Sequence, residues 1–172
     1  NRVTQLLILM VSGFSQGMQP IVGFNLGAGL YHRVRESIIV AVKTASIILT
    51  TGYIFIFFFP SQLASLFTSD QSLINYCIPA LRISLCTFPF VATQMIATAF
   101  FQSIRKPGLS MAISLSRQIF FLLPLLLILP PIFGVYGVWM SMPIADIFSI
   151  TLSIILLRRE YYRLKHIYVQ PQ

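Results

Sequence analysis

The chain has 172 residues, of which 56% are hydrophobic and only 9% are charged, and its mean hydropathy is +0.83. A soluble domain usually carries about a quarter charged residues, so this composition excludes a soluble enzyme or binding module and predicts an integral membrane protein or a large piece of one. The net charge of +8 would suggest nucleic acid in a soluble protein, but cytoplasmic loops of membrane proteins also collect Lys and Arg, and we predict no nucleic-acid partner.

Five apolar stretches follow one another along the chain, and each is long enough for a membrane-spanning helix, which needs about 20 apolar residues. The predicted spans cover residues 3–28, 36–59, 72–103, 108–130 and 134–157. Pro79 and Pro89 predict kinks in the long third span. The apolar run over residues 122–129 does not alternate in polarity as the strands of a β-barrel do. The predicted fold class is therefore an all-α polytopic membrane protein, with a helical bundle over residues 1–157.

The Lys and Arg residues of the connectors lie on one side of this arrangement. They are Arg33 and Arg35 in the first connector, Arg105 and Lys106 in the third, and Arg158, Arg159, Arg163 and Lys165 in a basic tail over residues 158–172. The connectors on the other side, residues 61–71 and 131–133, contain no Lys or Arg. Since these residues accumulate in cytoplasmic loops, we predict a protein of the cell (inner) membrane with its N-terminal end outside and its tail in the cytoplasm.

Two of the spans carry polar stripes at helical spacing. The stripes consist of Gln5, Ser12, Gln16, Gln19 and Gly23 on the first span and Thr87, Gln94, Thr98 and Gln102 on the third. Amides that face lipid would be costly, so the stripes are expected to face protein or water. They either form hydrogen bonds between helices or line a substrate cavity, and the cavity candidates are Gln16, Gln19, Gln94 and Thr98.

Arg82 is a fifth candidate for the cavity. It lies roughly 15 Å from the outer end of its span at 1.5 Å per residue. A cation at that depth needs a partner or a wet cavity, so pairing with carbonyl groups and contact with a substrate both remain open.

Arg117 and Asp146 lie on the fourth and fifth spans, which a short turn near Ile132 connects. Arg117 lies 15 residues before Ile132 and Asp146 lies 14 residues after it, so on antiparallel helices the two have about the same depth. A lone buried charge is expensive, whereas opposite charges at one height can pair. We therefore predict an ion pair, with a structural role or a role in coupling or gating.

Sequence signals of catalysis are absent. The chain contains no phosphate-binding loop, no nucleophile elbow, and no spacing of His, Cys and Asp that is typical of a metal site. We predict that the protein is not an enzyme and that it uses no cofactor and no bound metal.

Several motifs, taken in order, resemble the multidrug and toxic compound extrusion (MATE) family. Residues 16–29, QGMQPIVGFNLGAG, with Arg33-Val34-Arg35 after them, are similar to the eighth helix of that family and the following loop. Residues 101–107, FQSIRKP, resemble the link between its tenth and eleventh helices. Residues 117–130 and 134–139 are similar to its eleventh and twelfth helices. The resemblance covers nearly the whole chain.

This resemblance implies five helices, the eighth to the twelfth, that form most of the C-terminal lobe of a twelve-helix secondary exporter. The family exports small organic, often cationic compounds by alternating access, driven by inward Na⁺ or H⁺. The implied partners are the lipid bilayer, an N-terminal lobe and a seventh helix outside this chain. One departure concerns the ion, because the family's described cation site in this lobe uses carboxylates on helices seven and ten. Residues 72–103 contain no Asp or Glu.

Two other functions remain open at this point. A flippase for lipid-linked oligosaccharides shares the broader fold, and a polar, strongly cationic cavity would favour it. A membrane scaffold without transport activity would instead use its polar stripes fully in bonds between helices and would leave no cavity.

Overall fold

The computed structural model describes residues 2–65 and 71–168, and side chains from Gln5 to Gln62 and from Ile78 to Arg163. Residues 66–70 of the predicted outer connector and residues 169–172 of the predicted tail lie outside the described residues. The helices are α1 (Arg2–Gly27), α2 (Tyr31–Phe58), α3 (Pro60–Ser65), α4 (Gln71–Ser84), α5 (Phe88–Ser103), α6 (Pro107–Leu115), the π-helix η1 (Ser116–Leu122), α7 (Leu123–Phe133) and α8 (Val135–Tyr168).

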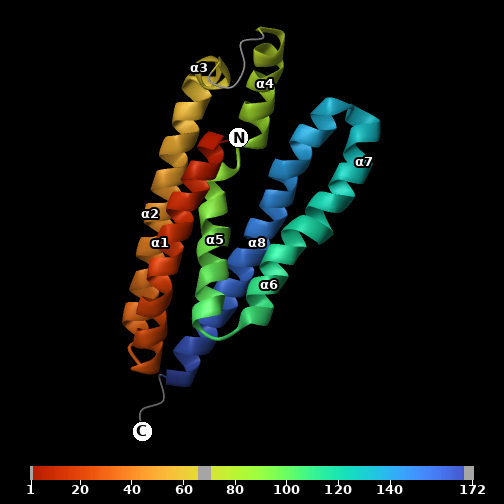
Figure 1. The fold of residues 1–172 in the computed structure, drawn as a ribbon. Helices are drawn as coiled ribbons and strands as arrows, with labels where there is room; N and C mark the ends of the chain where they lie inside the picture. Colours follow the sequence, from red (N-terminus) through yellow and green to blue (C-terminus); the bar gives the residue numbers. More distant parts are fainter. Residues whose placement is uncertain (1, 66–70, 169–172) are drawn as a thin grey trace.

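The long helices form a bundle with two hairpins (Figure 1). In the first, α1 packs along α2, and both contact α5. In the second, α7 folds back on α8, which also contacts α4, α5 and η1. The core lies where α1, α2 and α5 meet, and its fully buried members include Val22, Leu49, Ile96 and Phe101. This core joins the two hairpins through α5 and α8.

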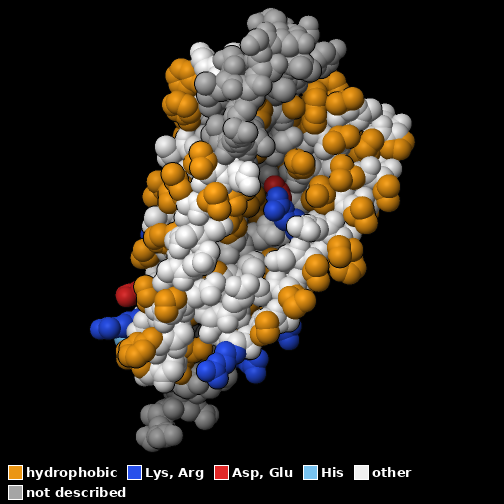
Figure 2. All heavy atoms as spheres, in the orientation of Figure 1, with side chains coloured by type: hydrophobic (Ala, Val, Ile, Leu, Met, Phe, Trp, Pro, Cys, Tyr) orange, Lys and Arg blue, Asp and Glu red, His pale blue; other side chains and the backbone are white. Residues whose placement is uncertain are grey.

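The predicted all-α membrane fold class is confirmed. Four helical segments are long and apolar enough to cross a membrane, and the bent pair Ile78–Ser84 and Phe88–Ser103 would make a fifth span. Large apolar side chains such as Phe24, Phe120 and Leu127 are mostly exposed, as expected for a surface that contacts lipid. Cationic side chains gather at the lower end of the molecule in Figure 2, the end of the α5–α6 connector in Figure 1.

The third predicted span is broken between α4 and α5, with an angle of 46° between the two pieces. The break covers Leu85 to Thr87, and Pro89 lies in the first turn of α5. Because Pro89 has no N–H group, it cannot donate to the carbonyl of Leu85, and the chain instead forms a tighter turn in which the Phe88 N–H donates to that carbonyl at 3.0 Å. Pro79 lies within α4 without ending it.

The fourth predicted span contains a π-helical segment, η1, in place of a simple kink at Pro124. The N–H group of Leu123 donates to the carbonyl of Gln118, five residues earlier. Pro124 follows directly and has no N–H group with which to continue the α-helical pattern. A π-helical turn accommodates one extra residue, so η1 changes which face of the segment the side chains around Arg117 occupy.

At the end of the bundle predicted to be cytoplasmic, α8 runs past the predicted end of its span at Leu157 and continues to Tyr168. Glu160 is buried there and pairs with Lys106 of the α5–α6 connector. The guanidinium carbon of Arg35 on α2 lies 5.4 Å from the centre of the Tyr161 ring. The start of the predicted tail therefore packs against two other elements as part of a helix.

Candidate functional site

A cavity of about 360 Å³ lies among α1, α5, α6 and η1. Polar residues that line it are Ser12, Ser15, Gln16 and Gln19 from α1, Gln94, Thr98 and Gln102 from α5, and Ser114, Arg117 and Gln118 from α6 and η1. The two stripes of the sequence thus meet across one space, and the π-helical segment closes it on a third side. Gln5 of the first stripe is exposed and does not line this cavity.

The four polar candidates Gln16, Gln19, Gln94 and Thr98 all line the cavity. Gln19 donates to the side chain of Gln102 at 3.1 Å, which joins α1 to α5. Thr98 donates to the carbonyl of Gln94 in its own helix at 2.9 Å. Gln94 is buried, and its Oε1 atom has no hydrogen-bond partner among the described residues. The stripes are therefore only partly used in protein–protein hydrogen bonds.

Arg82 does not join this group. Its guanidinium carbon lies 5.0 Å from the centre of the Phe57 ring of α2, and the side chain is exposed. Arg82 precedes the break at Leu85–Thr87, and the bend gives α4 a different direction from α5. The sequence made Arg82 a candidate from its depth in a span over residues 72–103, and depth alone does not give the direction of the side chain.

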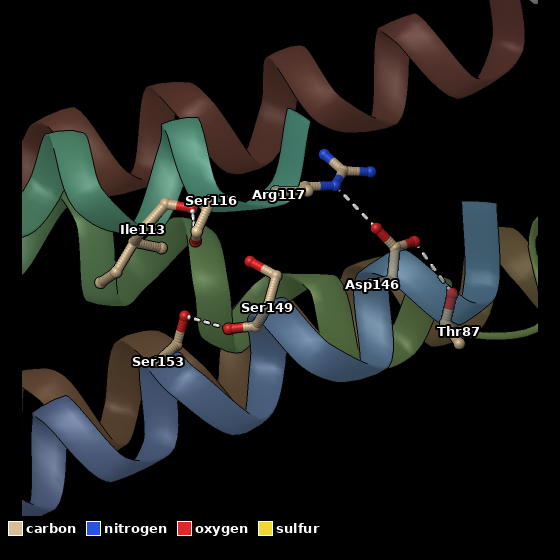
Figure 3. Close-up of polar contacts among 7 residues, drawn as sticks. All are labelled: Thr87, Ile113, Ser116, Arg117, Asp146, Ser149 and Ser153. Carbon is tan, nitrogen blue, oxygen red and sulfur yellow. Dashed lines mark hydrogen bonds and ion pairs between the residues drawn. The ribbon is translucent and has the colours of Figure 1, made fainter. Parts of the chain in front are cut away.

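The structure brings Arg117 and Asp146 together at the middle of their hairpin (Figure 3). The Nε atom of Arg117 donates to Oδ1 of Asp146 at 2.7 Å. The hydroxyl of Thr87, at the break before α5, donates to Oδ2 at 3.0 Å. The Asp146 side chain is 6% exposed and that of Arg117 is 39% exposed. The carboxylate is therefore enclosed by two donors, while part of the guanidinium reaches the cavity.

Sequence reasoning missed four contributors to this site, namely Thr87 as a donor to Asp146, and Ser15, Ser114 and Gln118 as lining residues. Thr87 belonged to a recognised stripe, but only the break before α5 turns it toward α8. Gln118 is adjacent to Arg117 in η1, and both line the cavity. The available sequence signal for these lining residues was the polar segment Ser116-Arg117-Gln118 shortly before Pro124 in an otherwise apolar span. Among the described residues, no group of three His, Cys, Asp or Glu residues converges.

Comparisons with known proteins agree with this architecture. The model of the family described as MatE matches residues 1–128. The FAD transporter of Shewanella oneidensis is 27% identical over 146 residues, which are 85% of this chain and 32% of that protein. The multidrug export protein MepA of Staphylococcus aureus is 23% identical over 84% of this chain and 32% of its own length.

A solved structure adds a spatial match. The MATE multidrug transporter DinF-BH, in complex with rhodamine 6G, superposes with a TM-score of 0.86 and 40% sequence identity, over 92% of this chain and 36% of that chain. The chain thus spans about a third of the length of the curated relatives it matches.

Proposed function

Because this chain belongs to the MatE family, the multidrug and toxic compound extrusion transporters, we propose that the protein is a secondary active exporter of small organic compounds. The cavity among α1, α5 and η1 is the observation that carries the proposal, since it gathers amide, hydroxyl and guanidinium groups from several helices of an otherwise apolar bundle. This lobe would supply one side of a central chamber, and substrate and coupling ion would each favour a different facing state of two lobes.

We propose that an inward gradient of Na⁺ or H⁺ drives the export. Asp146 is the carboxylate that we propose for such a role, because it lies against the α4–α5 break through its bond to Thr87. Lipophilic cations are the substrate class that the family resemblance implies. FAD, the compound named for one relative, is an anion, so both charge classes belong in a substrate panel.

A groove of about 900 Å³ between α1 and α2 supports the proposal that further helices of the same protein complete the lobe. Its lining includes Gly13, Gly17 and Ile21 of α1 and Val40 and Ala41 of α2. Small residues allow close approach of helices in a membrane. We propose that helix seven of the full-length protein lies in this groove and that an N-terminal lobe faces the cavity.

The two rival functions receive less support. A scaffold would use its stripes fully in hydrogen bonds, yet the Gln94 Oε1 atom is buried without a described partner. A flippase for lipid-linked oligosaccharides would call for a strongly cationic cavity, and Arg117 is the single charged side chain among the described residues that line this one.

The cavity is tested by replacing Gln16 or Gln94 with Leu in the full-length protein, reconstituted in vesicles with an imposed Na⁺ or proton gradient. We expect the relative export rates of rhodamine 6G and FAD to change several-fold, because the amide groups would contact substrate, while the amount of folded protein changes little. Gln5→Leu is the matched control, since Gln5 lies on the same stripe but outside the cavity. Loss of folded protein and equal loss of every substrate would instead indicate structural hydrogen bonds.

The proposed orientation predicts the accessibility of two exposed positions in a full-length variant without Cys77 and Cys86. A cysteine replacing Ser61 is expected to react with a membrane-impermeant maleimide added to intact cells. A cysteine replacing Tyr162 is expected to react only after permeabilisation. Replacing Tyr162 leaves every Lys and Arg of the tail in place, so the charges that set the orientation are unchanged. The reverse labelling pattern would overturn the orientation.

A further inference from the structure

We infer that the cavity of this lobe binds an anionic group of its substrate, a carboxylate or a phosphate, at the terminal nitrogens of Arg117. The inference rests on the proposed function, in which the cavity is part of a substrate chamber. It assigns a chemical class and a contact atom to that chamber, and it differs from the cationic class implied by the family resemblance.

Arg117 is bound to Asp146 through one nitrogen only, which leaves its two terminal nitrogens without a partner among the described residues. The ion pair with Asp146 uses Nε alone. Figure 3 shows the Nε atom facing the carboxylate, and neither terminal nitrogen donates to any described residue. Asp146 is in turn fixed by Thr87 on its second oxygen. A guanidinium that is oriented by its Nε atom presents its terminal N–H groups without further loss of side-chain freedom.

The charge balance of the cavity favours an anion. Arg117 is 39% exposed and lines the cavity, whereas Asp146 is 6% exposed and is absent from the lining. No Asp or Glu among the described residues lines this space. A substrate anion at the terminal nitrogens would lie nearer to the guanidinium charge than to the carboxylate behind it. A substrate cation would find no carboxylate surface in this cavity.

Neutral donors line the same cavity. The side chains of Gln16, Gln118 and Ser114 line the cavity and form no hydrogen bond with a described residue. Carboxylates and phosphates pair with arginine through two parallel N–H···O bonds, which are stronger than bonds between neutral groups. Burial of an anion in an apolar bundle is costly without such bonds. The arginine and its neutral neighbours together match a group with several acceptor oxygens.

The test compares two dyes of one ring system, anionic fluorescein and cationic rhodamine 6G, for binding to the full-length protein in detergent. The double variant Arg117→Gln/Asp146→Asn removes both charges and leaves no unpaired ion, so it is the variant of choice for folding. We expect its Kd for fluorescein to rise about tenfold or more, because charge-assisted bonds are lost, while its Kd for rhodamine 6G stays the same or falls. Asp146→Asn alone should bind fluorescein at least as tightly as the parent protein.

Arg82→Gln is the matched control, because it removes one exposed arginine that lies outside the cavity, and fluorescein binding should not change. If the double variant binds fluorescein like the parent protein, or loses both dyes equally, the inference is wrong. The proposed function fails separately, if the parent protein binds the dyes but exports neither under any imposed gradient. Fluorescein binding that high salt abolishes equally in the parent and in the double variant would mean that Arg117 is not the contact.

Discussion

Replacing Arg117 with Gln in the full-length protein is expected to destabilise it by about 3–5 kcal/mol, the usual cost of leaving one member of a buried ion pair alone. Asp146 would keep only the bond from Thr87 and would remain almost wholly enclosed. The opposite variant, Asp146→Asn, should cost less, because the guanidinium of Arg117 is 39% exposed to the cavity and can be hydrated there. The thermal melting of purified protein in detergent measures both effects.

The double variant Arg117→Gln/Asp146→Asn should recover most of the stability that Arg117→Gln loses, since no ion is left unpaired. If it melts no higher than Arg117→Gln alone, the two charges are not energetic partners. Exchange of the two residues provides a further distinction. An exchanged protein that folds but does not transport would indicate that a carboxylate at position 146 also serves the coupling ion or proton.

Replacing Gly137 with Ala is the second change expected to have a large effect. A Cβ atom at this position would overlap the carbonyl oxygen of Leu129 and would lie 2.8 Å from the nitrogen of Pro130. These are backbone atoms of α7, so they cannot move aside as a flexible side chain could. We expect a loss of about 3 kcal/mol, the upper part of the usual range for overpacking, and separation of α7 from α8.

Gly108→Ala is the control for this change. Gly108 is exposed in the first turn of α6, and a Cβ atom there would meet nothing within 4 Å. Its melting temperature should stay within the small range of ordinary surface substitutions. Melting of Gly137→Ala at the temperature of the parent protein would contradict the close approach of the two helices.

The end of α1 is determined by local residues. The N–H groups of Gly29 and Leu30 donate to the carbonyls of Leu26 and Asn25, which is the arrangement that ends a helix with a left-handed residue. Gly29 has φ +72°, a conformation that glycine adopts without strain. The end of α1 at Gly27-Ala28-Gly29 therefore follows from local residues.

By itself, the sequence determined the membrane class, the approximate ranges of the helical segments and the equal height of Arg117 and Asp146. These properties depend on composition and on distance along the chain. Arg117 and Asp146 have one height because they lie almost the same number of residues from the short connection at which the chain turns back from α7 to α8. The glutamine stripes likewise follow from the helical period alone.

Tertiary structure decided which polar stripes face one another and which candidate side chains do not line the cavity. The bend before Phe88 directs Thr87 toward Asp146 and separates Arg82 from the cavity. The π-helical segment η1 turns Arg117 and Gln118 to the same space. Both effects change the phase of a helix by a fraction of a turn, and a repeat pattern cannot reveal them, because it assumes one unbroken period. Only the packing of α5 against α1 and α8 determines the orientation of the helices in which the Asp146 carboxylate is buried and the Arg117 guanidinium is partly exposed.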